Sequence, residues 1–433
     1  DATPTNGLNI ENILLNEDTI TSTGTDPSPD IRFVDDVSEY RGSGTNDDVD
    51  YAVVSGDLRL QTNLSCRSMR FNADTDLGPY TLTLKRNLTH DAGTITANNA
   101  KLLLDGPCLG CVDNTDVQDL NLNTTPNLVW SKIEVNKSAG AATMLTGNMV
   151  VNDSLIIRSG LFDQNTLQLT GTAAALQTGG GWRSAAAGGL QPFIDGPFDL
   201  QSGYVHFDGA SSKIIKRLSY NELRISGTGI HNLAGDAEVR SLLDMRDDGQ
   251  LTTGTNRLYG AGGLTMEVDA ANDPELYLGT ITTAPLPELS GTYTNLPTDG
   301  KISLNGTGDQ FLKPLTLWRL GFEGPGEKTL TGNVTVNEAL RFDQNGTVTA
   351  GSYVDAGRYV LFLQNNASGA LQHADNGGTG GHGHVVGRLR RAVDGMANYF
   401  FPLGADGSSA LFYESADLDF TADYANITNV TGR

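Results

Sequence analysis

The chain has 433 residues, and its 29 Lys and Arg face 51 Asp and Glu, so the formal net charge at pH 7 is −22. This acidic balance argues against nucleic acid and anionic membrane surfaces as partners, and no apolar run reaches the roughly 18 residues of a membrane-spanning helix. The length exceeds a typical domain of about 100–200 residues, while 52 glycines and 38% hydrophobic residues indicate many short strands and turns.

Residues 1–50 are rich in Thr, Asp, Asn and Ser and predict an extended N-terminal lead-in or cap. Near its end, Asp47, Asp48 and Asp50 bring carboxylates together, which makes them weak candidates for binding Ca²⁺. The segment lacks the pattern of an EF-hand loop, so we favour a solvated acidic turn. Calcium is therefore the one possible cofactor, and we otherwise expect none.

Residues 51–375 contain short runs in which every second residue is apolar, separated by Gly, Asn and Asp, as expected for half-buried strands and turns. The clearest run is LTGNVTVNEALRF at Leu330–Phe342. Related runs occur at Leu145–Ile157 and Leu233–Met245, and a weaker one begins at Leu60. The chain therefore contains an internal repeat.

A second segment repeats with the same spacing and extends the repeated unit. Gly203–Gly209 and the residues after it match Gly300–Gly306 and the residues after it, 97 positions later. Together the two segments define a unit of about ninety residues. Within the last copy, alternation predicts that four side chains face the core: Leu330, Val334, Val336 and Leu340.

Two all-β architectures fit this unit. Tandem β-sandwich domains have about this length, but they are usually joined by evident linkers. A β-solenoid stacks short strands so that each coil buries its apolar edge on the next. Apolar pairs return about every ten residues without a linker. We therefore predict an elongated, parallel β-helix-like solenoid over residues 51–375, with sandwiches as the alternative.

The C-terminal part differs from the repeats. Residues 376–384 are dominated by Gly and predict a flexible linker, and residues 385–433 predict a small separate β module. His382 and His384 form an H-x-H pair near His373 and Asp375, which has metal-ligand spacing. Because a glycine-rich backbone does not fix such side chains, we favour the linker interpretation.

Several other charged or sulfur-containing groups are candidates for chemistry. Arg388, Arg390 and Arg391 predict local ion pairs, with docking onto an acidic neighbour as the alternative. Cys108 and Cys111 have CxxC spacing, but no second pair completes a zinc site. The third cysteine of the chain is Cys66. We favour a structural role for all three cysteines, and one disulfide among them is compatible with a location outside the cell.

The densest mixed-charge cluster lies near the third repeat. A polysaccharide lyase or hydrolase built on a solenoid needs carboxylates or a basic side chain beside its cleft. The cluster comprises Asp244, Asp247, Asp248, Arg240 and Arg246. Strand alternation places Asp244 and Arg246 outward, so we favour a solvated face over a catalytic site.

Three runs resemble the repeat regions of large surface proteins of Bacteroidota: Gly300–Gln310, Leu330–Leu340 and Gly387–Gly404. The resemblance covers roughly residues 51 to 404, although its motifs are degenerate strand-and-turn patterns. It implies secretion to the cell surface by the type IX system and a role as adhesin, fibre or scaffold. The chain lacks a recognisable C-terminal sorting domain, which such proteins carry before maturation.

The function we predict is therefore non-enzymatic. We expect a secreted structural protein that acts as a surface fibre, filament subunit or adhesin stalk, through self-association or attachment to other surface proteins. The alternative is a β-helix enzyme or binding module that acts on polysaccharide.

Overall fold

A computed structural model describes most of the 433-residue chain. It describes strand segments within residues 8–54 and then, apart from a few positions, the following ranges: 58–106, 117–122, 128–268, 273–342, 352–373, 383–405, 413–419 and 429–432. Most side chains are described between residues 58 and 405, and a few beyond residue 405. The chain divides into two compact units, Asp1–Phe207 (unit 1) and Asp208–Arg433 (unit 2).

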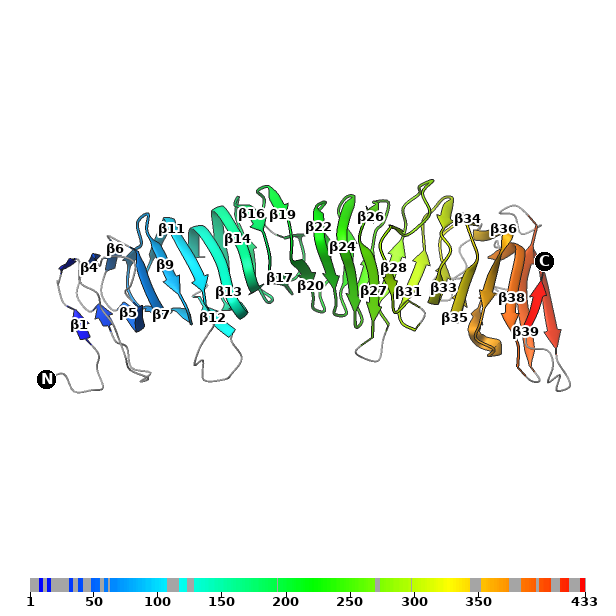
Figure 1. Cartoon of the computed structure of the whole chain (residues 1–433), viewed down its shortest axis with the longest axis horizontal. Helices are drawn as coiled ribbons and strands as arrows, with labels where there is room; N and C mark the ends of the chain where they lie inside the picture. Colours follow the sequence, from blue (N-terminus) through cyan, green and yellow to red (C-terminus); the bar gives the residue numbers. More distant parts are fainter. Residues whose placement is uncertain are drawn as a thin grey trace. The chain divides into compact units, whose positions relative to one another are not determined.

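Unit 1 consists of short strands that stack as successive rungs (Figure 1). Its strands are β1 (Leu8–Ile10), β2 (Leu14–Asn16), β3 (Ile31–Phe33), β4 (Ser38–Arg41), β5 (Asp48–Val54), β6 (Leu58–Leu60), β7 (Leu64–Phe71), β8 (Thr75–Asp76), β9 (Thr81–Leu84), β10 (Leu88–His90), β11 (Ile95–Asp105), β12 (Val117–Asn121), β13 (Leu128–Thr146), β14 (Met149–Asp163), β15 (Leu169–Thr170), β16 (Ala174–Gln177), β17 (Gly181–Ser184), β18 (Leu190–Gln191), β19 (Phe198–Leu200) and β20 (Tyr204–Phe207).

Unit 2 is built in the same way and contains one 3₁₀ turn, η1 (Ser368–Ala370). Its strands are β21 (Lys213–Ile215), β22 (Ser219–Ile225), β23 (Ile230–Leu233), β24 (Ala237–Arg246), β25 (Gln250–Thr252), β26 (Leu258–Gly260), β27 (Gly263–Glu267), β28 (Glu275–Leu278), β29 (Glu288–Leu289), β30 (Tyr293–Thr294), β31 (Lys301–Leu304), β32 (Gln310–Leu312), β33 (Thr316–Phe322), β34 (Gly326–Leu330), β35 (Val334–Arg341), β36 (Ser352–Leu363), β37 (Leu371–Gln372), β38 (His384–Ala392), β39 (Asn398–Gly404), β40 (Tyr413–Asp419) and β41 (Asn429–Gly432). No helix in the described residues is long and apolar enough to cross a membrane.

The register of the strands shows a β-solenoid in each unit, as predicted. In unit 1, β14 pairs in parallel with β15 and β16, which belong to the next coil. Residues that pair are 20 positions apart in the sequence at Met149, Leu155 and Ile157, as in Leu155↔Ala175. In unit 2 the shift varies, from 18 residues for Ile302↔Leu320 to 31 for Val354↔Val385. The structural repeat is thus one coil, and the ninety-residue sequence unit contains several coils.

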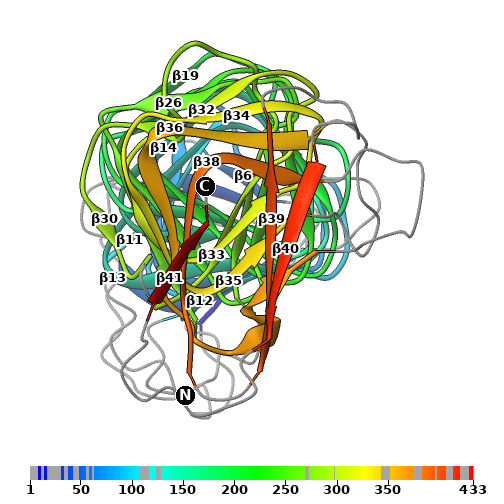
Figure 2. The ribbon, with the colours of Figure 1, turned by 90° about the vertical axis from the view of Figure 1, so that its right-hand side faces the viewer.

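Parallel pairing continues into both segments that we expected to differ from the array. In the expected lead-in, β1 pairs with β3 and β3 with β5, both in parallel. In the expected C-terminal module, β38 pairs in parallel with β36. Antiparallel pairing appears, among the described strands, in β39 with β40 and in β38 with β41, at the end of unit 2 that faces the viewer in Figure 2.

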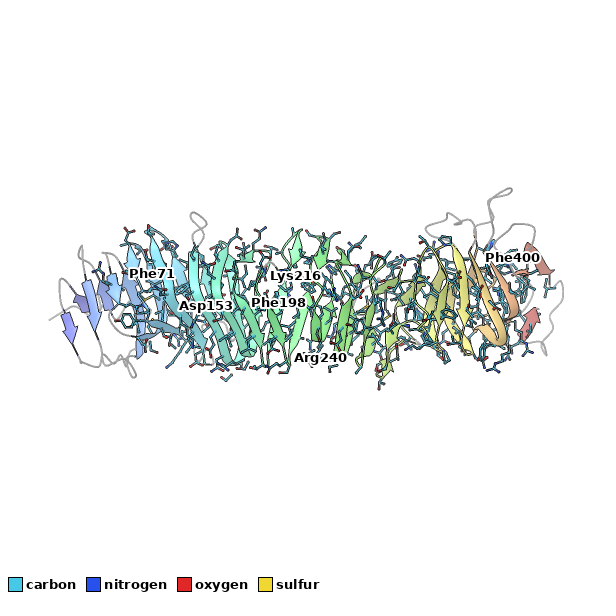
Figure 3. The ribbon with its side chains drawn as sticks, turned by 90° about the horizontal axis from the view of Figure 1, so that it is seen from above. Phe71, Asp153, Phe198, Lys216, Arg240 and Phe400 are labelled. Atoms are coloured by element: carbon cyan, nitrogen blue, oxygen red, sulfur yellow. The ribbon has the colours of Figure 1, made fainter. Side chains whose placement is uncertain are left out.

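Side chains that alternate along each strand fill the interior of the coils. The four residues predicted to face the core are buried, since Leu330 is 2% exposed and Val334, Val336 and Leu340 are 0% exposed. The copy near residue 145 differs at its first residue, because Leu145 is 42% exposed. In unit 1 the interior includes aromatic rings such as Phe71, labelled in Figure 3, which is completely buried.

Glycine is required where the backbone of one coil turns directly against the previous coil. Gly203 has φ +83°, and a Cβ at this position would lie 2.1 Å from the carbonyl oxygen of Gly180. Gly300, its counterpart 97 residues later, also has a positive φ, of +79°. The repeated glycine therefore marks a corner with a positive φ, where a Cβ would meet the backbone of the previous coil at Gly203 and the side chain of Met266 at Gly300.

We predict that Gly203→Ala destabilises unit 1 strongly, because the new methyl group must displace backbone as well as adopt a strained φ. The expected loss in the free energy of unfolding is on the order of 3 kcal/mol, measured by urea denaturation. Gly188→Ala is the matched control, since Gly188 also has a positive φ (+64°) but no atom of the described residues within 4 Å of the added Cβ. Its expected loss is about 1 kcal/mol, and equal losses for the two variants would contradict the backbone-contact argument.

Candidate functional sites

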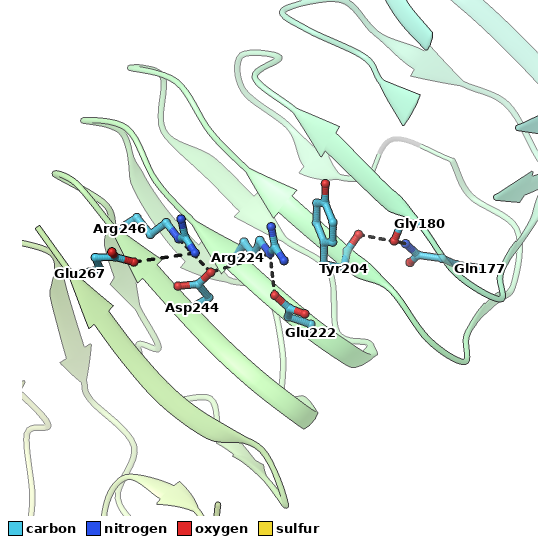
Figure 4. Close-up of polar contacts among 8 residues, drawn as sticks. All are labelled: Gln177, Gly180, Tyr204, Glu222, Arg224, Asp244, Arg246 and Glu267. Atoms are coloured by element: carbon cyan, nitrogen blue, oxygen red, sulfur yellow. Dashed lines mark hydrogen bonds and ion pairs between the residues drawn. The ribbon is translucent and has the colours of Figure 1, made fainter. Parts of the chain in front are cut away.

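The mixed-charge cluster singled out from the sequence forms an ion-pair ladder across three neighbouring strands of unit 2. Arg224 on β22 has its Nε 2.6 Å from Glu222 Oε1 and 3.8 Å from Asp244 Oδ2. Arg246 on β24 has its Nε 2.9 Å from the same Asp244 oxygen, and its Nη2 lies 3.8 Å from Glu267 Oε2 on β27 (Figure 4). Opposite charges therefore face each other both along a strand and between neighbouring coils.

This ladder corrects the expectation of a solvated face. Asp244 points outward from β24, as predicted, but it is only 2% exposed because two arginines lie against it. Asp247 has a positive φ (51°) in the turn that follows β24. Arg240, on the same strand and labelled in Figure 3, is exposed. The cluster holds adjacent coils together and does not gather its carboxylates around a cleft.

The histidine pair is not assembled as a metal site in the described residues. His384 Nε2 lies 3.0 Å from the carbonyl oxygen of Ala405, and its ring stacks on Tyr353 with centroids 5.6 Å apart. His373 Nε2 lies 2.8 Å from the carbonyl oxygen of Gly383. His382 and Asp375 lie outside the described residues. The two described imidazoles thus bind backbone.

The remaining sequence candidates are only partly described. Cys66 is buried in β7 with its Sγ 4.0 Å from Met69 Sδ, whereas Cys108 and Cys111 lie outside the described residues. For the calcium candidates, Asp47 lies outside them too, and Asp48 and Asp50 are described only as backbone of β5. Within the described part of the chain, no group of three or more His, Cys, Asp or Glu side chains is placed to hold a metal ion.

Arg391 uses its charge differently from the expected ion pairs. The side chain is completely buried, and its guanidinium donates hydrogen bonds to the carbonyl oxygens of Phe400 (2.7 Å), Ser368 (3.1 Å) and Ala367 (3.4 Å). It also lies over the ring of Tyr399, 5.3 Å from the centroid. Burial lowers the pKa of Arg391 to about 10, so the group stays charged at neutral pH.

Arg391 belongs to a set of buried polar side chains, which we call corner caps, that bind backbone carbonyls where the coils turn. In unit 1, Gln177 is 2% exposed, and its Nε2 donates to the carbonyl oxygens of Gly180 (3.1 Å) and Tyr204 (2.9 Å) (Figure 4). Also in unit 1, Gln164 is completely buried and donates to the carbonyl oxygen of Leu167. A carbonyl left without a donor inside the coil would destabilise the fold, so each cap replaces the missing partner.

The corner caps of unit 2 occupy equivalent positions in the two repeated copies. Lys213 and Gln310 are 97 residues apart, and so are His231 and Lys328. All four are at most 1% exposed. Lys328 Nζ donates to three carbonyl oxygens, and Gln310 Nε2 donates to those of Leu278 (2.8 Å) and Thr280 (2.9 Å). Different side chains thus perform the same task.

Burial lowers the pKa values of the lysine and histidine caps and so favours their neutral forms. Burial lowers the pKa of Lys328 to about 8, against the opposing effect of Asp309. Burial also lowers the pKa of His231 to about 4, although its hydrogen bond to the Ser226 carbonyl favours the charged form. At neutral pH His231 is therefore an uncharged hydrogen-bond donor.

Our sequence analysis missed the corner caps, although one signal was present. In the runs Lys213–Ile215 and Gln310–Leu312, alternation places the first residue inward together with the last, so a polar residue occupies an inward position. An inward polar residue beside a glycine turn is the sequence signature of such a cap.

A polar groove lies on the outer face of unit 2. It comprises two adjoining hollows of about 300 and about 490 Å³, which share Glu275, Lys301 and Arg341. Its floor contains a buried ion pair, in which Lys301 Nζ lies 2.6 Å from Glu323 Oε1. The hydroxyl of Tyr277 donates a hydrogen bond to Glu275. Burial, and to a smaller extent this hydrogen bond, raises the pKa of Tyr277, so the phenol is neutral at pH 7. None of these residues was singled out from the sequence.

No protein-family model matches this chain, and no curated protein or solved structure is significantly similar to it. The resemblance to Bacteroidota surface proteins stays a prediction from the sequence.

We predict that acid destabilises unit 2 partly through His231. The unfolded imidazole has a pKa near 6.5 and the folded one about 4. Between these values the unfolded state binds more protons, so stability is lost as the pH falls from about 6.5 to 4, by roughly 3 kcal/mol in total. His231→Gln should remove this dependence, measured by urea unfolding at several pH values. The matched control is Asn232→Ala at the exposed neighbouring position, which should retain it; an unchanged dependence in His231→Gln would contradict the assignment.

We also predict that the cap at residue 328 can be exchanged but not deleted. Lys328→Met removes the donor from three carbonyl oxygens, and the expected loss in the free energy of unfolding is on the order of 3 kcal/mol. Lys328→Gln places the side chain of the neighbouring cap in the same position and should recover about half of that loss. Equal losses in both variants, measured by thermal and urea denaturation, would show that capping is not the role of this side chain.

Proposed function

We propose that this protein is a secreted structural protein whose β-solenoid units form the stalk or scaffold of a surface fibre or adhesin. The proposal is supported mainly by the hydrogen bonds that buried polar side chains make to the backbone. Lys213, His231 and Lys328 are the kinds of residue that supply acid, base or nucleophile in enzymes, and Arg391 is the kind that binds anionic groups. Each of the four instead binds backbone carbonyls at a coil corner.

The strand register supports the same role. Each coil pairs with the next through parallel backbone hydrogen bonds, for example over the four consecutive positions of β28 and β31. Outside the core, the ion pairs Arg224–Asp244 and Arg246–Glu267 add contacts between adjacent strands. A ladder of this kind resists extension along its stacking direction because many hydrogen bonds must break together. Such stiffness suits a protein that holds another group away from a surface.

We predict that the protein is displayed outside the cell. Immunogold electron microscopy of intact, unpermeabilised source cells, with antibodies raised against the purified chain, should place label on the surface or on fibres that extend from it. A strain from which the gene has been deleted is the control for antibody specificity. Label that appears only after permeabilisation would contradict the proposal. Turnover of uronate polysaccharides by the purified chain, with or without Ca²⁺, would contradict the non-enzymatic role.

A further inference from the structure

The groove of unit 2 has a regular construction. The strands β25, β28, β31, β33 and β35 pair one after another in parallel, so residues in register form columns across the ladder. One column contains Gln250, Glu275, Lys301, Arg319 and Ala339. The next outward column, two positions further along each strand, contains Thr252, Tyr277, Ser303, Gly321 and Arg341, and Gln372 on β37 continues it.

The second column has small residues at its centre. Ser303 and Gly321 lie between the large side chains of Tyr277 and Arg341. A Cβ on Gly321 would lie 2.6 Å from Ser303 Oγ and 2.8 Å from Glu323 Oε1, so glycine leaves room for the Glu323 carboxylate that pairs with Lys301. The two hollows lie beside this ion pair and are lined by the larger side chains of the two columns.

One polar atom that lines the groove has no hydrogen-bond partner among the described residues. This atom is Asn305 Oδ1, which is buried and lines the larger hollow. Buried polar atoms of folded proteins are nearly always paired, and unpaired ones mark strain or a place for a ligand or water. Tyr277 and Lys301 line the same hollow, so a ligand there meets an acceptor, a phenol and an ammonium group together.

The charges of the groove nearly balance, which restricts the ligand. Lys301 lies against Glu323 and Glu275, and Arg319 Nη1 lies 2.5 Å from Asp273 Oδ2. A polyanion would meet these carboxylates in a protein whose net charge is already −22. A ligand with many neutral groups that both donate and accept hydrogen bonds fits the mixture of hydroxyl, amide, carboxylate and guanidinium groups better.

From these observations we propose that the groove, which is lined by Tyr277, Lys301, Asn305 and Arg341, binds an uncharged oligosaccharide. Sugar hydroxyls combine donor and acceptor in one group, so they can donate to Asn305 Oδ1 and accept from the charged side chains beside it. Parallel strands repeat about every 4.8 Å across the ladder, close to the length of one hexose in an extended glycan. Successive sugars therefore meet successive coils.

The test is calorimetric titration of the full chain with a panel of neutral hexaoligosaccharides of glucose, mannose, xylose and N-acetylglucosamine. Oligogalacturonate and sulfated heparin fragments form the anionic arm of the same experiment. We expect at least one neutral oligosaccharide to bind and to do so at least tenfold more tightly than either anionic probe. Failure of every neutral oligosaccharide to bind at millimolar concentration, or tighter binding of the anionic probes, would overturn the proposal.

Variants locate the site. Arg341→Ala should weaken binding at least tenfold, and Gln372→Ala, at an exposed groove residue, should weaken it severalfold. The matched control is Arg358→Ala, which removes an exposed arginine of the same unit that does not line the groove. Circular dichroism and the unfolding midpoint should be unchanged in the variants used. Full affinity in both groove variants, or an equal loss in the control, would overturn this location.

Discussion

The structure depends on satisfying backbone carbonyls at the corners of the coils. Along its strands a parallel solenoid pairs each backbone group with the coil before or after it, but at a corner the chain turns away from this ladder. Lys328 shows the solution, since one buried ammonium group binds the carbonyl oxygens of Gly306, Gly308 and Pro325. Gln177 and Arg391 act in the same way with two and three carbonyls. Without these donors the apolar core could not close at its corners.

The fold could be predicted from the sequence because alternation is a local property. Leu330, Val334, Val336 and Leu340 are buried as expected, and they report the two-residue period directly. The register could not be predicted, because coils vary from 18 residues between Ile302 and Leu320 to 31 between Val354 and Val385. With such variation, the residue that will lie beside a given strand position depends on the length of the intervening turn.

This uncertainty of register explains what was missed at the candidate sites. Asp244 was correctly placed outward, but its burial arises from Arg224, a residue of the preceding coil that lies 20 positions earlier in the sequence. The groove has the same origin, since Tyr277, Lys301, Arg319 and Arg341 come from four separate coils. The charged cluster, whose residues lie close together in the sequence, stabilises the ladder. The residues of the groove lie far apart in the sequence and come together only when the coils stack.

The repeated copies in unit 2 show how a solenoid can diverge. Lys213 and Gln310 occupy one corner position, and His231 and Lys328 occupy another, with a cation, an amide and an imidazole all serving as donors. At such a corner the fold requires the reach and the donor capacity of the side chain, and several residue types meet that requirement. Two solenoids can therefore share every corner while their aligned residues look unrelated, and a search for relatives would gain from scoring inward positions by hydrogen-bonding capacity.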